Sequence, residues 1–394
     1  MLRTLFEHTL RSRWKGPEIL VRYWDGREFR VGAPPAVVTV TMRSPTVLRE
    51  ALLSGSSLAL GHAYTDGRLG IDGDLQALLR AVAQLSGGET GKKSGARRWL
   101  RAMVTQNTPR RAVANARFHY DMGNAFFRLW LDPSLTYSCA YFNTEHDDIA
   151  KAQEQKRERI CQKLELEEGQ TLLDVGCGWG SLLFHAIERY GVSGVGVTPS
   201  REQARYVGEE AKRRGVSDQL TLHLADWRTV RGAYDRVVSV GMYEHVGWTH
   251  GREFFQAWQS WLKPRGVSVL HTIGSMVGIS VDPWLGENIL PGAYLPSLSE
   301  LAAHAAASNL IVTDVENLWR HYALTLAAWS KNFSAAREQI LRMTDEEFVR
   351  TWWLYLNAAE ASFRAGRTLL WQIVLTNGKR PQQQLTRDRW VLGP

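Results

Sequence analysis

Three short segments of this 394-residue chain carry residue types that could do chemistry together. Tyr137–Cys139 ends in a thiol, Leu172–Gly180 is an apolar run that breaks into glycines, and Met242–His245 holds a carboxylate beside an imidazole. The middle segment is typical of a buried strand that opens into a loop where a nucleotide-like ligand approaches the backbone. We expect the outer two segments to bring the thiol and the carboxylate to the same edge of one sheet. This combination predicts an enzyme that uses S-adenosylmethionine.

The glycine loop is the expected cofactor site. Gly176, Gly178 and Gly180 lie at a strand-to-helix junction, where the missing Cβ lets the backbone approach a ligand and the helix start offers free N–H groups. A dinucleotide oxidoreductase would place a carboxylate at the end of the second strand to hold the ribose. Here Thr198 follows that strand, which argues against NAD but also departs from most S-adenosylmethionine enzymes.

Polar and aromatic residues near the loop suit the rest of such a cofactor. Asp226 and Trp227, just past the third expected strand, are placed to hydrogen-bond the adenine amino group and to stack on its ring. Trp179 and Tyr137 are expected to face the sulfonium, because aromatic faces attract cations. Packing in the core is the alternative for these aromatics, since the chain has 16 Trp.

Beyond residue 111 the pattern alternates between strands and helices. The expected strands are Thr171–Val175, Gly194–Val197, Leu220–Leu224, Asp235–Val240, Val267–Ile273 and Ile311–Val315. The expected helices are Ser181–Tyr190, Ser200–Arg214, Phe254–Leu262 and Ser299–Ala307. This rhythm predicts an α/β fold with a doubly wound, mostly parallel, Rossmann-like sheet that helices cover on both faces. In such sheets ligands bind beyond the carboxyl ends of the strands.

The N-terminal part predicts a smaller α+β domain over residues 1–86. Residues 2–10 form a basic amphipathic helix, which either lies on an anionic bilayer or packs on its own domain. Hairpin-like strands and two helices follow, at Ile19–Trp24, Glu28–Val31, Val37–Met42, Ser44–Ser54 and Leu75–Leu85. Residues 87–111 are rich in glycine and charge, so we expect a linker there, and residues 112–394 form the expected catalytic domain.

The composition indicates which cellular compartment and which kind of partner to expect. Lys and Arg outnumber Asp and Glu by 48 to 40, which suits an anionic surface but is also ordinary for a basic soluble protein. The three cysteines have no metal-ligand spacing, so we expect no metal and a reducing compartment. No apolar run approaches the ~18 residues of a membrane span. These features predict a cytoplasmic protein that associates peripherally with the inner face of the membrane.

Several further motifs follow one another along the larger domain. They are Phe118–Asp121, Asn124–Phe127, Tyr137–Phe142, Ala152–Lys156, Gly176–Gly180, Gly196–Thr198, Gln203, Glu244–Gly247 and His271–Ile273. In this order they resemble the cyclopropane fatty acid synthases and the related mycolic acid cyclopropane synthases. The resemblance runs from about Phe118 to Gly378, with a weaker N-terminal part.

The resemblance implies a class I methyltransferase fold and a particular reaction. A methyl group passes from S-adenosylmethionine to the cis double bond of an acyl chain in a membrane phospholipid, which leaves a carbocation. A bound bicarbonate ion then removes a proton and the ring closes. The family's small domain binds lipid and contributes to a dimer, and the weak N-terminal match leaves a homodimer open here.

The resemblance also assigns residues to roles. It implies that the bicarbonate is held by Cys139, Glu244, His271, the Ile273 backbone and Tyr322. It implies that the cofactor is contacted by Tyr137, Ser138, Asp174, Gly176, Gly178, Trp179, Gly180, Thr198, Gln203, Asp226 and Trp227. The family, too, lacks the ribose carboxylate, which accounts for Thr198.

Each of these residues taken singly has a structural alternative, such as a buried thiol at Cys139 or a core imidazole at His271. Three other functions also remain open. A neighbouring enzyme would make a methylene or methyl branch from the same cation. A lipid-binding protein with a relic methyltransferase fold should have lost Cys139, Glu244 or Tyr322, and none is lost. A small-molecule or nucleic-acid methyltransferase would not explain the segment from His119 to Phe142, and because no base-reading motif is visible we expect no nucleic-acid partner.

Overall fold

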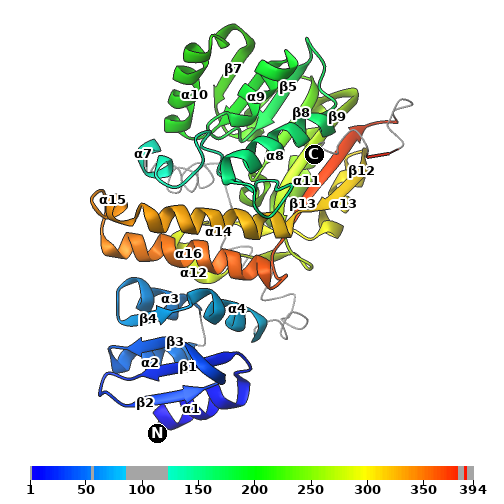
Figure 1. Cartoon of the computed structure of the whole chain (residues 1–394). Helices are drawn as coiled ribbons and strands as arrows, with labels where there is room; N and C mark the ends of the chain where they lie inside the picture. Colours follow the sequence, from blue (N-terminus) through cyan, green and yellow to red (C-terminus); the bar gives the residue numbers. More distant parts are fainter. Residues whose placement is uncertain (1, 55–56, 86–122, 380–385, 388–394) are drawn as a thin grey trace. The chain divides into compact units, whose positions relative to one another are not determined.

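The computed structural model describes residues 2–54, 57–85, 123–379 and 386–387 (Figure 1). The chain divides into two compact units, which are described separately. The first combines residues 1–95, 281–291 and 326–368, and the second combines residues 96–280, 292–325 and 369–394. Two segments that we expected in the catalytic domain therefore cluster with the N-terminal part. The predicted linker at 87–111 lies outside the described residues and stays a prediction.

The second unit is built on a seven-stranded sheet of order β12-β13-β9-β8-β5-β6-β7. Its strands are β5 (Thr171–Val175), β6 (Ser193–Thr198), β7 (Leu220–Leu224), β8 (Tyr234–Val240), β9 (Leu262–Gly274), β12 (Leu310–Asn317) and β13 (Leu369–Asn377). Neighbouring strands from β7 to β9 pair in parallel, whereas β13 runs antiparallel to both β9 and β12. The order reverses beside β5, so the loop after β5 opens at the point where such sheets bind ligands.

Helices cover both faces of this sheet. They are α7 (Asn124–Arg128), α8 (Ile149–Leu164), α9 (Ser181–Tyr190), α10 (Arg201–Arg214), α11 (Gly251–Trp261) and α13 (Leu298–Ala307), and a short strand pair joins β10 (Ile279–Ser280) to β11 (Tyr294–Leu295). Alternate strand residues enter different cores. Leu173 and Val237 pack with α11 and α13, whereas Leu172 and Val238 pack with α8, α9 and α10. The prediction of a doubly wound, mostly parallel α/β sheet is confirmed.

The six predicted strands of this sheet are all present, with ends shifted by up to five residues. The sequence pattern does not predict β13. Its residues are buried almost throughout, so the strand has no alternating pattern to distinguish it from a buried helical segment. It matters for the site, because it pairs Gln372 directly with His271 across β9.

The first unit contains a four-stranded sheet of order β2-β1-β3-β4. The strands are β1 (Pro17–Arg22), β2 (Glu28–Val31), β3 (Ala33–Met42) and β4 (Leu69–Gly73), and the helices are α1 (Leu2–Arg13), α2 (Pro45–Ser54), α3 (Ser57–Thr65), α4 (Leu75–Leu85), α12 (Pro283–Asn288), α15 (Arg337–Leu341) and α16 (Glu346–Arg364). The helix α14 (Trp319–Ala335) is divided between the two units, because its residues up to Thr325 belong to the second unit and those from Leu326 belong to the first. The predicted smaller α+β part is confirmed, although α3 and β4 were not predicted.

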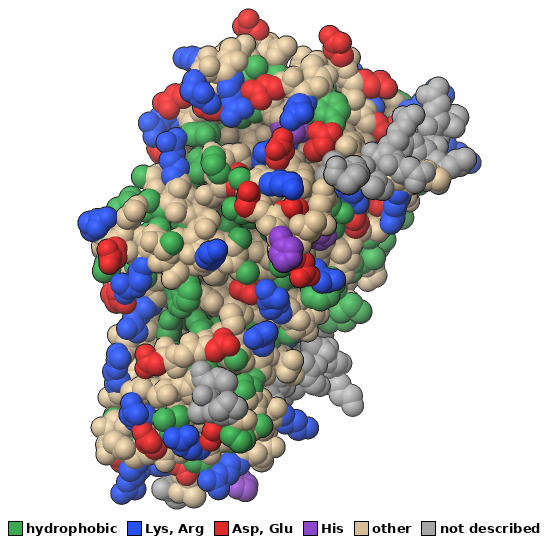
Figure 2. All heavy atoms as spheres, viewed as in Figure 1, with side chains coloured by type: hydrophobic (Ala, Val, Ile, Leu, Met, Phe, Trp, Pro, Cys, Tyr) green, Lys and Arg blue, Asp and Glu red, His purple; other side chains and the backbone are tan. Residues whose placement is uncertain are grey.

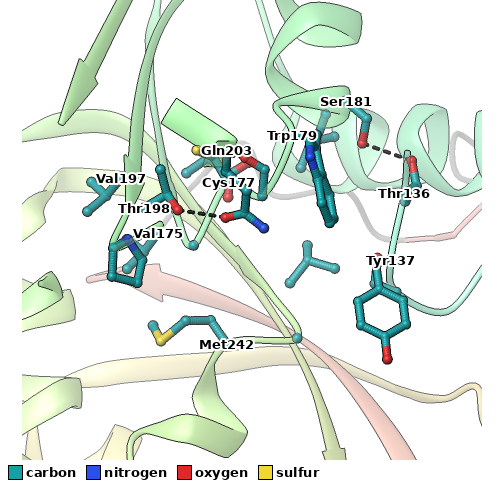
Figure 3. Close-up of a pocket in the computed structure, with 18 of the residues that line it drawn as sticks. Thr136, Tyr137, Val175, Cys177, Trp179, Ser181, Val197, Thr198, Gln203 and Met242 are labelled. Carbon is teal, nitrogen blue, oxygen red and sulfur yellow. Dashed lines mark hydrogen bonds between the residues drawn. The ribbon is translucent and has the colours of Figure 1, made fainter. Parts of the chain in front are cut away.

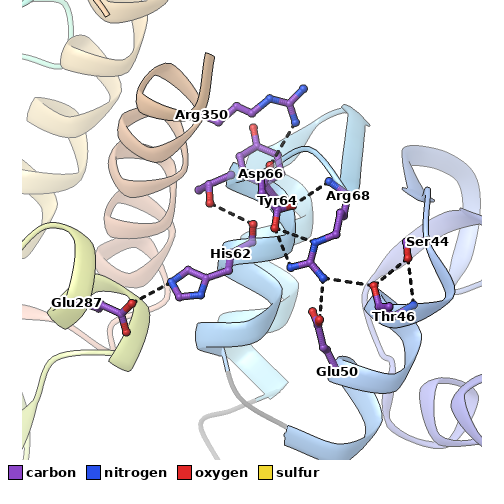
Figure 4. Close-up of polar contacts among 10 residues, drawn as sticks. Ser44, Thr46, Glu50, His62, Tyr64, Asp66, Arg68, Glu287 and Arg350 are labelled. Atoms are coloured by element: carbon purple, nitrogen blue, oxygen red, sulfur yellow. Dashed lines mark hydrogen bonds and ion pairs between the residues drawn. The ribbon is translucent and has the colours of Figure 1, made fainter. Parts of the chain in front are cut away.

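Polar contacts link the three segments of the first unit (Figure 4). His62 Nε2 lies 3.3 Å from a carboxylate oxygen of Glu287, and Arg350 donates to the backbone oxygen of Tyr64 at 3.2 Å. Gln76 on α4 donates to the backbone and side-chain oxygens of Asn357 on α16, each at 3.0 Å. These contacts join residues more than 200 positions apart, so sequence order alone could not have assigned 326–368 to this unit.

The surface shows mixed charge. On the face drawn in Figure 2, Lys and Arg side chains are interspersed with Asp and Glu rather than gathered into one broad patch. Within the ranges that the structure describes, every helix is either too short or too polar to cross a bilayer.

Candidate active site

A pocket opens where β5 gives way to α9, and its walls come from the loops that follow β5, β6 and β8 (Figure 3). Gly176 has a φ of +89°, and a Cβ there would lie 2.8 Å from the side chain of Met242. Gly178 also has a positive φ, of +56°, but a Cβ there would meet nothing within 4 Å. Glycine at 176 is therefore needed both for backbone conformation and for space, whereas at 178 conformation alone requires it.

Thr198 and Gln203 form the wall beneath the end of β6. Thr198 Oγ1 donates to Gln203 Oε1 at 2.7 Å, and both side chains are buried. Because the Gln203 oxygen is engaged, its amide nitrogen is left to face the pocket, as Figure 3 shows. This pair occupies the place where a dinucleotide enzyme would hold a ribose carboxylate.

Aromatic side chains line the opposite wall. The Trp179 indole N–H donates to Asn124 Oδ1 at 2.7 Å, and its ring packs 5.0 Å from Phe127. Tyr137 packs against the same Phe127, at 5.5 Å between ring centroids. Trp179 and Tyr137 lie on the same side of the pocket in Figure 3. A hydrogen-bonded and packed indole is a rigid surface of the kind that attracts a cation.

The expected adenine end is built from the turn after β7. The Trp227 ring has the Arg228 guanidinium 4.5 Å from its centroid and Phe254 at 5.1 Å. The Asp226 carboxylate caps this turn, since it accepts from the Arg228 backbone N–H at 2.9 Å and also from the Arg228 side chain. Asp226 is therefore engaged locally, and Trp227 presents its remaining surface to the pocket.

A buried lysine, Lys156, is among the residues that line the pocket. Lys156 on α8 donates to Ser138 Oγ at 3.0 Å and interacts electrostatically with Asp174, Cys139 and His271. Burial lowers the pKa of Lys156 to about 8. Burial also raises the pKa of Asp174 to about 7, against the opposing effect of Lys156, and Asp174 Oδ1 has no hydrogen-bond partner among the described residues.

Glu244 follows β8 in a short 3-10 turn, Tyr243–His245. Its Oε1 accepts the Ile273 backbone N–H from β9 at 2.6 Å, and burial raises the pKa of the carboxyl to about 7. By hydrogen-bond geometry Glu244 Oε2 has no partner in the described part of the chain, although the Thr272 side chain acts on this carboxyl and lowers its pKa. The resemblance placed the Ile273 N–H directly against an anion, whereas here this N–H fixes the carboxylate of Glu244.

His271 lies two residues before Ile273 on β9, which places both on the same face of the strand. Its Nδ1 lies 3.1 Å from Gln372 Nε2, while no described residue hydrogen-bonds its Nε2. Its backbone oxygen accepts from Gly241 N–H at 2.8 Å, and Gly241 lines the pocket. His271 is therefore adjacent to the pocket wall. Burial lowers its pKa well below the usual value, and Lys156 and Lys163 act in the same direction.

Cys139 lies in a segment that contacts α14, and Tyr322 lies on α14 itself. Cys139 is fully buried, its thiol donates to the Ala140 oxygen at 3.1 Å, and burial raises its pKa above the ordinary range. Ala140 N–H donates to Thr325 Oγ1 at 3.0 Å. Tyr322 is buried one turn before Thr325 on α14. The motif Phe118–Asp121 lies outside the described residues.

Sequence reasoning did not assign functions to Asn124, Lys156, Lys163 or Gln372. Asn124 and Lys156 stood inside motifs that carried the family resemblance, so they could have been singled out. Lys163 and Gln372 belong to no motif and are recognisable only from their burial. The role of a buried amide or a buried lysine can be inferred only once its hydrogen-bond partners are known.

Known proteins resemble the chain over most of its length. Residues 107–373 match the family described as mycolic acid cyclopropane synthetase, and residues 5–93 match a domain of unknown function. The cyclopropane-fatty-acyl-phospholipid synthase of Escherichia coli K12 is 36% identical over 88% of this chain and 89% of its own. A Pseudomonas putida protein named "Probable fatty acid methyltransferase" is 33% identical over 90% of each chain.

A solved structure shares the fold of about two thirds of this chain. The crystal structure of a mycolic acid cyclopropane synthase complexed with SAH and CTAB has a TM-score of 0.64 and 35% identity. The match covers 67% of this chain and 98% of that one. The expected methyltransferase fold is thereby confirmed.

Proposed function

Because this chain belongs to the mycolic acid cyclopropane synthetase family, we propose that it transfers a methylene group from S-adenosylmethionine to the cis double bond of acyl chains in membrane phospholipids. The product is a cyclopropane fatty acid. The reaction passes through a carbocation on the acyl chain. The substrate class is that of the Escherichia coli relative, which matches nearly the whole chain.

One observation carries the proposal. Glu244 Oε2 and His271 Nε2 are buried polar atoms that lack a hydrogen-bond partner among the described residues; Glu244 is bonded to the Ile273 N–H two residues along β9 from His271, whose backbone oxygen is bonded to the pocket-lining Gly241. An unsatisfied buried polar atom costs about 1–3 kcal/mol, so two at one place indicate a site that a ligand completes. A small oxyanion with both donor and acceptor oxygens fits this pair.

The residues present fit both groups that the reaction requires. When bound, S-adenosylmethionine supplies the methyl group and bicarbonate supplies the base that takes a proton from the cationic chain. Trp179, Tyr137, Thr198 and Gln203 would hold the former, and Glu244, His271, Cys139 and Tyr322 would hold the latter. Trp179 and Tyr137 offer π-faces to positive charge.

The protein must also avoid trapping the cation. A carbocation reacts with any good nucleophile, and Cys139 is the obvious danger in this site. Burial raises the pKa of this thiol, so that it stays protonated, and the thiolate rather than the thiol is the nucleophile. Cys139 can therefore act as a weak hydrogen-bond donor without forming a covalent adduct.

The substrate's reactive carbons lie in a bilayer, so the enzyme must work at the membrane surface. We propose peripheral association with the inner face of the membrane, with a preference for anionic headgroups. The excess of 48 Lys and Arg over 40 Asp and Glu supports this preference. A homodimer remains part of the proposal on the family resemblance alone.

Expression in a bacterial host that lacks such an enzyme, followed by proton NMR of the extracted phospholipids, tests the proposed function. We expect strongly shielded ring protons from the wild type. Glu244→Gln should nearly abolish them while the purified variant still binds S-adenosylhomocysteine. Glu209→Gln, a change of the same kind at an exposed helix position, is the matched control. Full product from Glu244→Gln would reject the proposed anion site.

A second candidate is a fatty acid methyltransferase that gives a methylene- or methyl-branched chain from the same cation. The 33% identity to the Pseudomonas putida protein favours it. The same NMR spectra distinguish the two products, because a methylene branch gives vinylidene signals and no shielded ring protons.

A further inference from the structure

A buried polar chain reaches His271 from the side opposite the cofactor pocket. Lys163 Nζ on α8 lies 2.6 Å from Glu316 Oε2 on β12 and 2.5 Å from Gln372 Oε1 on β13. Gln372 Nε2 in turn lies 3.1 Å from His271 Nδ1. Glu316 is also paired with Arg159 at 2.8 Å. The side chain of Lys163 is 0% exposed, and Gln372 and His271 are buried, so the part of this chain from Lys163 to His271 is shielded from water.

Lys163, at one end of this run of hydrogen bonds, determines which atoms of Gln372 and His271 donate and which accept. An ammonium group has three donors and no acceptor, so it must face the oxygen of Gln372 rather than the NH2 group. The amide nitrogen of Gln372 then faces His271 and donates. A donor at this position requires Nδ1 to accept, so Nδ1 carries no proton. Since burial disfavours the charged imidazolium, the single proton of the neutral ring resides on Nε2.

We propose that Lys163 and Gln372 are positioning residues that hold His271 in the Nε2–H tautomer, so that it points a hydrogen-bond donor at the anion site. The catalytic significance of this donor rests on the proposed function, whereas the tautomer itself does not. Reversing the tautomer would turn a lone pair toward the anion and replace attraction by repulsion. The motifs that carry the family resemblance contain neither Lys163 nor Gln372.

Gln372→Glu is the sharpest test. It hardly changes the volume of the side chain, and it replaces the Gln372 amide group that donates to His271 by a carboxylate oxygen that can only accept. A carboxylate between Lys163 and His271 would accept from both, which moves the imidazole proton to Nδ1. Nitrogen NMR of protein labelled with 15N-histidine reads this directly, and the His271 signals are assigned by their loss in His271→Gln. We expect the proton on Nε2 in the wild type and on Nδ1 in Gln372→Glu.

Kinetics supply the second readout. We expect Gln372→Glu to lower kcat by about 10–100-fold with an unchanged KM for S-adenosylmethionine, the size of loss found when the group that orients a metal-ligating histidine is altered. Gln372→Met, which removes the donor without adding charge, should give mixed tautomers and an intermediate kcat. Gln219→Glu adds the same charge at an exposed position and should change neither readout.

The outcomes separate the two proposals. A wild-type proton on Nδ1, a doubly protonated His271 at pH 7.5, or an unchanged tautomer in Gln372→Glu would overturn the inference. A reversed tautomer with full kcat would refute the importance of the donor. If the wild type shows the Nε2–H tautomer but makes no modified lipid, the proposed function fails and the tautomer assignment stands.

Discussion

Glu244 combines two demands at the scale of a single residue. Its Oε1 is fixed by the Ile273 N–H, while its Oε2 is buried without a described partner. A carboxyl in this position is held where an anion site needs it, at a cost to the stability of the fold. Burial raises the pKa of this carboxyl, and its effect is larger than the opposing effect of the hydrogen bond from Ile273.

This cost predicts an unusual pH dependence of stability. Because burial raises the pKa of the Glu244 carboxyl to about 7, the folded protein keeps this proton up to about pH 7, whereas the unfolded chain loses it near the ordinary glutamate value of 4.5. Stability from this group is therefore lost as the pH rises from 4.5 to 7, by about 3 kcal/mol. We expect the free energy of unfolding of Glu244→Gln, relative to the wild type, to increase by about this amount between pH 5 and pH 8. Denaturant unfolding at both pH values measures it, and a constant difference would contradict the prediction.

Lys156 and Asp174 are two buried ionisable residues that interact electrostatically in the same pocket. Burial raises the pKa of Asp174 to about 7, and this value already includes the opposing effect of Lys156. If the Asp174 carboxylate binds the cofactor, affinity for S-adenosylhomocysteine should weaken as the pH falls through about 7. In Lys156→Met the weakening should begin at a higher pH, because the stabilising cation is gone. Calorimetric titrations from pH 6 to 9 test this, and Asp174→Asn should abolish the dependence.

At the scale of the element, the loop between β5 and α9 depends on two glycines in different ways. Gly176 and Gly178 both have positive φ, but only Gly176 faces a neighbour, the side chain of Met242. α9 begins at Ser181 with Gly180 as its N-cap in the left-handed region. The loop is therefore shaped by backbone conformation at all three glycines and by packing at two of them, since a Cβ at Gly180 would also lie 3.0 Å from Phe184.

These two glycines give a matched pair of variants. Ala at a left-handed position costs about 1–2 kcal/mol, and this cost applies to both. Gly176→Ala adds a collision at 2.8 Å, so we expect it to lower Tm more than Gly178→Ala and to weaken S-adenosylhomocysteine binding more strongly. Thermal unfolding and calorimetric binding compare them directly. Equal effects would mean that Met242 moves aside freely.

At the scale of the whole molecule, the charge excess is the feature that bears on membrane contact. The chain has a formal net charge of +8, yet both signs are interspersed on the face that Figure 2 draws. Attraction to an anionic bilayer must then be diffuse rather than dependent on one patch of that face. Diffuse attraction is strongly screened by salt.

We therefore expect turnover on vesicles with anionic headgroups to exceed that on neutral vesicles at low ionic strength. The advantage should shrink as salt shortens the Debye length from about 30 Å at 0.01 M to about 8 Å at 0.15 M. Initial rates on matched vesicles across this range measure it. Equal rates on both lipids at every salt concentration would refute the anionic preference.

The sequence by itself determined six of the seven strands of the sheet, the glycine loop after β5, and the placement of Glu244 just after β8 and of His271 on β9. It could do so because strand periodicity, glycine at a strand end and ordered motifs are local properties of the chain. Only the tertiary structure decided that residues 326–368 cluster with the N-terminal segment, that β13 completes the sheet, and that Lys163 reaches His271 through Gln372. These depend on contacts between residues 100 to 300 positions apart, and a buried hydrogen bond leaves no periodic trace in the sequence that could reveal its partner.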